Sequence, residues 1–257
     1  MRHSIIFLLI FIISGCSHFK DKGDDTAAWD ADRLYTEARG ELDSGSFDKA
    51  VEYYQKLETR FPFGVHAQQA LMDLAFAHYK NEEPDAAIAA CNRFIKLYPQ
   101  NAHVDYTYYL KGLTHFNRGK GMMQRYMPTD ESQRDPGAAF SAFQEFSELV
   151  KRFPESQYVA DSAKRMRYLR NILAKNEVHV ANYYMRRGAF VAAVNRGRYV
   201  IENYPKTPSV PDALVVMAKA YRVLEMDDLS NDALRVLELN YPNHPGLYEV
   251  KEIEVVK

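Results

Sequence analysis

Residues 71–99 read LMDLAFAHYKNEEPDAAIAACNRFIKLYP and hold one complete unit of a pattern that recurs along the chain. Ala75 and Ala87 lie twelve positions apart, and Pro99 follows after another twelve. A proline ends a helix because it lacks an amide hydrogen and clashes with the preceding turn. Small residues at matched positions indicate that two helices cross closely, since larger side chains would hold the axes apart. The stretch therefore predicts a pair of antiparallel helices.

The same pattern occurs five times. Aromatic-proline pairs end the five copies: Phe61-Pro62, Tyr98-Pro99, Phe153-Pro154, Tyr204-Pro205 and Tyr241-Pro242. Two small residues precede each pair: Ala38 and Ala50, Ala75 and Ala87, Gly112 and Ala142, Ala181 and Ala193, Ala218 and Ser230. The steps between prolines are 37, 55, 51 and 37, that is, a period of 37 with insertions of 18 and 14. The alternative is a set of unrelated helical hairpins. Such hairpins would not keep the small residues and the prolines at the same spacing from one copy to the next.

This pattern resembles the tetratricopeptide repeat, whose usual period is about 34 residues. The resemblance implies an all-α fold, a right-handed α-solenoid of five tetratricopeptide-type helix pairs. The 18-residue insertion lies within 118–137 and is expected to be a loop, because it is rich in glycine and proline. Residues 156–187 contain neither glycine nor proline. At about 1.5 Å per residue they are expected to form one helix of roughly 48 Å.

The N-terminus has the features of an export signal. Arg2 precedes an apolar run over residues 5–13, which is too short to span a bilayer because a spanning helix needs about 20 residues. Ile13-Ser14-Gly15-Cys16 then resemble the bacterial lipobox, which implies cleavage before Cys16 and acyl chains, including palmitate, on this residue. In lipoproteins of this kind, an aspartate directly after the lipidated cysteine often leads to retention in the inner membrane. Ser17 occupies this position here, so the outer membrane is the expected location. The alternative is an ordinary secretory signal that happens to contain a cysteine.

These features predict the organisation of the chain. We expect a signal peptide at 1–15, a lipidated flexible tether at 16–28, and repeats one to three over 29–155. The long helix and repeats four and five would occupy 156–257. Cys91 has no cysteine partner once Cys16 is lipidated, and it lies among apolar helix residues. It is therefore expected to be a buried core residue.

Motifs that would indicate an enzyme or a bound cofactor were not found. The eight histidines show no metal-binding spacing, and we found no nucleophile or phosphate-loop motif. The formal net charge of −1 argues against a nucleic-acid-binding protein. We therefore expect a non-enzymatic protein without catalytic residues, metal or cofactor, apart from the covalent lipid on Cys16.

Two groups of residues are candidates for binding other proteins. Residues 151–200 carry 11 Lys and Arg against 3 Asp and Glu. They could bind an acidic partner, since arginine binds carboxylates through two parallel hydrogen bonds. The alternative is a solvated face that pairs with the acidic C-terminal repeat. Aromatic residues of the first helices in each pair, among them Tyr35, Tyr79 and Tyr108, are expected on a concave face that could hold an extended peptide. Packing between helices is the alternative for each ring. Phe63 and Gly64, in the link after the first pair, are either a packing cap or an exposed contact.

Longer stretches of the sequence resemble the BamD family, the lipoprotein subunits of the machine that folds β-barrel proteins into the Gram-negative outer membrane. They are RFPFGVHAQQA (60–70), YKNEEPDAA (79–87), RFIKLYP (93–99), DYTYYLKGLT (105–114), RDP (134–136), SQYVADSAKRM (156–166) and LAKNEVHVANYYMRRGAFVAAVNR (173–196). The resemblance covers most of residues 30–205. Beyond about Ser209 the chain matches by pattern only.

The resemblance implies a scaffold subunit of the outer-membrane β-barrel assembly (BAM) complex that faces the periplasm. The N-terminal repeats would bind the signals of unfolded barrel proteins, with Phe63, Gly64, Tyr35, Tyr79 and Tyr108 as the expected contacts. The C-terminal repeats would bind a periplasmic POTRA domain of BamA through Arg196, with Asn195, Arg198 and Arg187 beside it. The loop and long helix would lie near the lipoproteins BamC and BamE. The alternative is a repeat lipoprotein that binds peptidoglycan or a cell-division partner.

Overall fold

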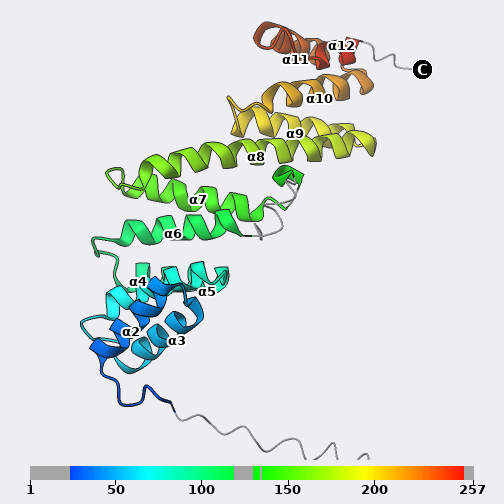
Figure 1. Ribbon diagram of the computed structural model, residues 1–257. Coiled ribbons are helices and arrows are strands. Elements are labelled where there is room, and N and C mark those ends of the chain that lie inside the picture. Colours follow the sequence, from blue (N-terminus) through cyan, green and yellow to red (C-terminus); the bar gives the residue numbers. More distant parts are fainter. Residues whose placement is uncertain (1–23, 119–129, 134, 252–257) are drawn as a thin grey trace, which may run out of the picture. The chain divides into compact units, whose positions relative to one another are not determined.

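The computed structural model describes residues 24–118, 130–133 and 135–251 (Figure 1). The predicted signal peptide, the lipidation site Cys16, Ser17 and most of the loop insertion lie outside the described residues. The chain divides into two compact units, one through Ala67 and one from Gln68. Each unit is described by itself below.

Unit 1 contains the first helix pair, α2 (Ala31–Ser44) and α3 (Phe47–Arg60). Asp30 caps α2, because its side chain accepts a hydrogen bond from the Arg33 amide at 2.8 Å. Gly45 ends the helix in the left-handed conformation, where glycine carries no steric penalty. A two-residue turn then leads directly into α3.

Unit 2 contains the remaining helices. They are α4 (Ala67–Lys80), whose first residue ends unit 1, α5 (Pro84–Leu97), α6 (Val104–Asn117), α7 (Gly137–Arg152), α8 (Val159–Arg186), α9 (Phe190–Asn203), α10 (Val210–Val223), α11 (Asp227–Asn240) and α12 (Gly246–Lys251), with a short 3-10 helix, η2 (Glu131–Gln133). The described residues contain no strand. The prediction of an all-α fold of five tetratricopeptide-type helix pairs, α2/α3 to α10/α11, is confirmed.

The column of small residues is buried in every pair, as the sequence predicted. Ala38, Ala50, Ala142, Ala181 and Ala193 are each fully buried, and the other members are buried as well. Gly112 is the tightest position, because a Cβ atom there would lie 2.4 Å from Cε1 of Phe146 on α7. In the last pair, the Ser230 hydroxyl donates a hydrogen bond of 2.9 Å to the Ala218 carbonyl across the helix crossing. The repeat therefore marks where helices touch.

Helix α8 spans 28 residues and confirms the prediction of one long helix here. Its first half packs on α7, where Leu169 joins Ala142 and Phe146 in one apolar cluster. Its second half packs on α9 and α10, where Ala174 and Val178 contact residues of both helices. One helix thus serves two successive pairs.

Two short elements were not predicted from the sequence. Helix η2 forms at the end of the loop insertion and is held to α8, where the Asn176 side chain donates to the Ser132 carbonyl at 2.8 Å. Helix α12 follows the last pair, and its Leu247 and Val250 are buried in a cluster with Leu214 and Leu237. Helix α12 therefore covers apolar residues of α10 and α11.

The predicted flexible tether, residues 16–28, needs a correction at its end. Residues 24–28 form a turn that is hydrogen-bonded to α3, and Thr26 is only 3% exposed. Lys56 donates to the Asp24 carboxylate at 2.9 Å, and Arg60 donates to the Thr26 carbonyl at 2.6 Å. These residues are therefore bound to the first repeat, because acidic and basic groups that are far apart in the sequence meet here.

Candidate partner-binding surfaces

Helix α9 presents an exposed face of mixed chemistry in the C-terminal repeats. It packs between α8 and α10 and turns its remaining side outward. The exposed residues on this side include Val191, Asn195, Arg196, Arg198, Tyr199 and Glu202. The face combines apolar surface with cations, and this mixture is typical of regions that bind other proteins.

Arg196 is already paired within the chain. Its guanidinium lies 3.0 Å from Oε2 of Glu177 on α8, and the two side chains are 44% and 16% exposed. The hydrogen bond to Glu177 raises the pKa of Arg196, so the side chain is cationic at any physiological pH. Arg196 is the exposed member of this pair, whereas the Glu177 carboxylate is mostly buried and would lose a partner if Arg196 moved. A partner's carboxylate could reach the exposed guanidinium of Arg196 and would share it with Glu177.

The structure does not bring the four predicted polar residues to a single point. Arg196 extends toward α8, whereas Arg198 extends toward α10 and donates to the Tyr221 hydroxyl at 3.4 Å. Asn195 is exposed between them, and Arg187 is exposed at the C-terminal end of α8. The arrangement is a broad surface with a cation at each edge, and its contacts are spread along the outer side of α9.

The predicted aromatic contacts of unit 1 have different environments. Phe63 is 98% exposed and its neighbour Val65 is 96% exposed, so the link after α3 is an exposed apolar turn rather than a packing cap. Gly64 allows the turn to be tight, since a Cβ there would lie 3.3 Å from the Phe61 carbonyl oxygen. Tyr35 is half-buried, and its ring stacks on His66 with centroids 4.4 Å apart. Phe63 therefore offers a partner far more surface than Tyr35 does.

The two predicted tyrosines of unit 2 also differ. Tyr79 is half-buried, and its hydroxyl accepts a hydrogen bond of 2.7 Å from Asn117 on α6. Tyr108 is only 8% exposed and packs beside Phe153, with Arg152 and Lys111 near its ring. Tyr108 thus has the geometry of a core residue. Its expected contact with a peptide is not supported, because little of its ring reaches solvent.

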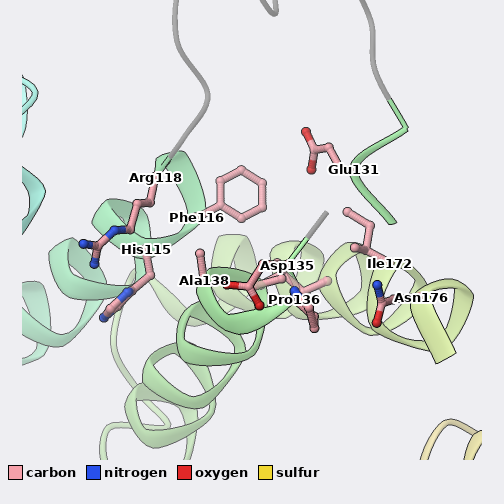
Figure 2. Close-up of a pocket in the computed structure, with 11 residues that line it drawn as sticks. His115, Phe116, Arg118, Glu131, Asp135, Pro136, Ala138, Ile172 and Asn176 are labelled. Carbon is pink, nitrogen blue, oxygen red and sulfur yellow. The ribbon is translucent and has the colours of Figure 1, made fainter. Parts of the chain in front are cut away.

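A small cavity lies where the loop insertion meets α6, α7 and α8 (Figure 2). It measures about 70 Å³, and the residues that line it include His115, Phe116, Glu131, Pro136 and Asn176. Burial lowers the pKa of His115, so this side chain favours the neutral form. Sites for small organic ligands measure about 300–1,000 Å³, so this cavity has room only for water or a small group.

The described residues show no arrangement for metal chemistry. Within residues 24–118, 130–133 and 135–251, no three His, Cys, Asp or Glu side chains are placed to hold a metal ion. Among the described helices, none combines the length and apolar composition needed to cross a membrane.

Sequence reasoning missed several exposed residues of these surfaces. Val191 and Tyr199 are 62% and 41% exposed on α9, beside the predicted Asn195 and Arg196. Their helical spacing could have identified them, since Val191, Asn195 and Tyr199 recur every four residues and alternate with the buried Ala193, Val194 and Val200. The exposed Val65 carried no such signal, because it lies in a turn.

The comparisons with known proteins agree with this description. Residues 27–237 match the family model YfiO, described as an outer membrane lipoprotein. Outer membrane protein assembly factor BamD of Neisseria meningitidis serogroup B is 45% identical over 86% of this chain and 83% of its own length. BamD of Xylella fastidiosa Temecula1 is 33% identical over 95% of this chain and 83% of its own length.

BamD of Vibrio cholerae is 33% identical over 91% of this chain and 95% of its own length. Solved structures are more distant. The tetratricopeptide domain of P58(IPK) is 14% identical, covering 86% of this chain and 64% of its own, with a TM-score of 0.42 that is too low to bear on the fold. With a family model matched over residues 27–237 and a relative that is 45% identical over 86% of the chain, this protein belongs to the YfiO (BamD) family of outer membrane lipoproteins.

Proposed function

We propose that this protein is a non-enzymatic scaffold subunit of the outer-membrane β-barrel assembly (BAM) complex. The observation that carries the proposal is its 45% identity, over 86% of the chain, to a protein named outer membrane protein assembly factor. The protein would bind BamA and the signals of unfolded outer-membrane proteins and hold them close together. It would promote folding and insertion by positioning, without making or breaking a covalent bond.

The outer face of α9 is the proposed docking surface for a POTRA domain of BamA. Its support is the cation at each edge, Arg196 and Arg198, with the exposed Val191 and Tyr199 between them. An acidic residue of BamA would compete with Glu177 for Arg196, and apolar contacts would supply most of the affinity. Arg187 and Asn195 would lie within the same contact.

The exposed link after α3 is the proposed contact for the signal of an unfolded barrel protein. Phe63 and Val65 are almost fully solvent-exposed, which is costly unless a partner covers them. A signal rich in apolar and aromatic residues would bury both side chains. Tyr35, which also lies in unit 1, would contribute the exposed part of its ring. In unit 2, the exposed part of the Tyr79 ring would be a separate contact for the signal.

The anchor and the remaining partners complete the proposal. A lipid on Cys16 would hold the protein to the outer membrane with its repeats in the periplasm, since more than one acyl chain gives durable binding. BamC and BamE would lie near η2 and α8. Nucleic acid has no part in this function.

Co-purification tests the proposal directly. Arg196→Glu removes the cation from the α9 surface and places a carboxylate beside Glu177, so BamA recovery from detergent-solubilised envelopes should fall on the order of tenfold. Arg39→Glu is the matched control, because Arg39 is 48% exposed and also forms an ion pair, with Asp43 on the same helix. The control should recover as much BamA as the wild type at equal expression.

Two other results would contradict parts of the proposal. Equal BamA recovery by all three proteins would exclude the contact at Arg196. If the wild-type protein recovered no BamA and instead retained peptidoglycan or a cell-division protein, the assembly function itself would be wrong.

A further inference from the structure

The segment before the first helix is attached to the side of α3. The Asp24 carboxylate accepts hydrogen bonds from Lys56, at 2.9 Å, and from Arg60, and both donors lie on α3. Arg60 also donates to the carbonyl of Thr26 at 2.6 Å. Lys56 and Arg60 are one helical turn apart, so they present two adjacent cations to the segment.

The turn itself is arranged to present these acceptors. The Thr26 amide and hydroxyl donate to Asp24 at 3.1 and 2.7 Å, and the Ala27 amide donates to the Asp24 carbonyl at 2.8 Å. The hydrogen bond from Lys56, followed by that from Thr26, lowers the pKa of Asp24 well below its usual range. The carboxylate is therefore ionised wherever the protein works.

A second contact is aromatic. Trp29, the only tryptophan in the chain, packs on Tyr53 of α3 with ring centroids 5.4 Å apart. Arg33 lies on α2, and its guanidinium is 4.4 Å from the centroid of the Trp29 ring. An ordinary helix cap contacts only the helix that it begins, whereas these contacts join the segment to α3, more than 20 residues further along the chain.

We propose that residues 24–29 are a clip that fastens the lipid tether to α3 and limits how far unit 1 can move from the membrane. This inference rests on the proposed lipid anchor at Cys16. The eight peptide steps from Cys16 to Asp24 span at most about 29 Å, whereas the fourteen steps from Cys16 to Asp30 would span about 50 Å. The clip therefore shortens the reach of the anchor by about 20 Å.

Hydrogen exchange of the lipid-free chain tests the clip by itself. Asp24→Asn removes the ionised acceptor, and Asp25→Asn is the matched control because Asp25 is its exposed neighbour. The amides of residues 26–29 should exchange slowly in the wild type and in the control, and on the order of tenfold faster in Asp24→Asn. Protection within α2 and α3 should not change.

Two results of this experiment would overturn the clip. One is equal exchange of residues 26–29 in the three proteins. The other is loss of protection throughout α2 and α3 in Asp24→Asn, because Asp24 would then support the helix pair rather than fasten the tether.

The lipidated protein tests whether the clip limits the distance of unit 1 from the membrane. Trp29 is a unique donor for energy transfer to dansyl phosphatidylethanolamine in phosphatidylethanolamine–phosphatidylglycerol vesicles. Transfer should be similar in the wild type and Asp25→Asn and about twofold lower in Asp24→Asn, whose free chain is longer. Equal transfer in all three would overturn the proposed limit on reach.

Failure of the anchor is distinguishable from failure of the clip. If the wild-type protein did not bind vesicles, the anchor at Cys16 and the reach would both be wrong. The exchange experiment would still decide whether residues 24–29 are fastened to α3.

Discussion

Gly112 shows how strongly one side chain can constrain a helix crossing. A methyl group at this position would overlap the ring of Phe146, which is fully buried and cannot move without displacing its neighbours. We expect Gly112→Ala to lower the free energy of unfolding by about 1–3 kcal/mol, despite the better helix propensity of alanine. Urea denaturation followed by circular dichroism measures this change.

Gly40 provides the control for this substitution. It is exposed on α2, and a Cβ there meets nothing within 4 Å. Gly40→Ala should therefore raise the free energy of unfolding by about 0.5–1 kcal/mol, since alanine loses less backbone entropy on folding. If both variants shifted stability in the same direction, crowding at Gly112 would not explain its effect.

The Cys91 thiol is expected to be unreactive toward thiol reagents in the folded protein. Burial raises the pKa of its thiol to about 12, so almost no thiolate is present at pH 8. In a Cys16→Ser chain, a thiol reagent should react with Cys91 only as fast as the protein opens. The raised pKa favours folding below the ordinary value of 9.0, and this contribution is lost as the pH rises from 9.0 to about 12. Rapid labelling at pH 8 without unfolding would contradict this expectation.

At the scale of elements, the turn between paired helices repeats one backbone conformation. Four pairs have a residue with positive φ at the same repeat position: Gly45, Glu82, Gly188 and Glu225, with φ of 84°, 59°, 72° and 57°. Two of these residues are glutamates, which adopt this conformation at a cost of about 1–2 kcal/mol. The backbone conformation of this turn is therefore kept from repeat to repeat, whereas the type of residue in it is not.

Substitution at these turns has a predictable sign. Glu82→Gly should raise the free energy of unfolding by up to about 1 kcal/mol, because relief of strain exceeds the extra entropy of the unfolded chain. Gly188→Ala, the opposite change at the same turn position, should lower it by about 1 kcal/mol. The urea midpoint with an unchanged m-value is the measurement. A lower midpoint for Glu82→Gly would show that the strain is absent.

The helix pairs were predictable because the information is local and repeated. A small residue at a crossing and a proline after a helix each act on their immediate neighbours. The pairing of Arg196 with Glu177 was not predictable, because it depends on how α8 packs against α9. Helix α12 escaped prediction because six residues are too few to show a helical period. The exposure of Phe63 was not predictable, because the sequence of this link is compatible both with a turn that packs on the helices and with an exposed turn.

At the scale of the whole molecule, the end of the last repeat depends on α12. Leu247 and Val250 cover the apolar side of α10 and α11, and terminal repeats need such a cover. Ending the chain after Pro245 should remove about 3–6 kcal/mol of stability, because two buried side chains are lost. Hydrogen exchange should show α11 losing protection first.

A chain that ends after Lys251 is the control for this truncation. It keeps Leu247 and Val250, so α11 should remain as protected as in the full-length protein. Equal loss of protection in both truncations would show that α12 is not the cover.

The length of α8 has a consequence for the evolution of this chain. Fourteen added residues make about 3.9 helical turns, so the side chains before and after them point in nearly the same direction, within about 40°. An insertion of seven or eleven residues would also preserve this alignment, to within about 20°. An insertion of nine residues would rotate the side chains that follow it by about half a turn. Such a rotation would carry Ala181 away from Ala193 and expose the apolar surface that they bury together. Insertions and deletions within this helix should therefore be tolerated only in near-whole turns.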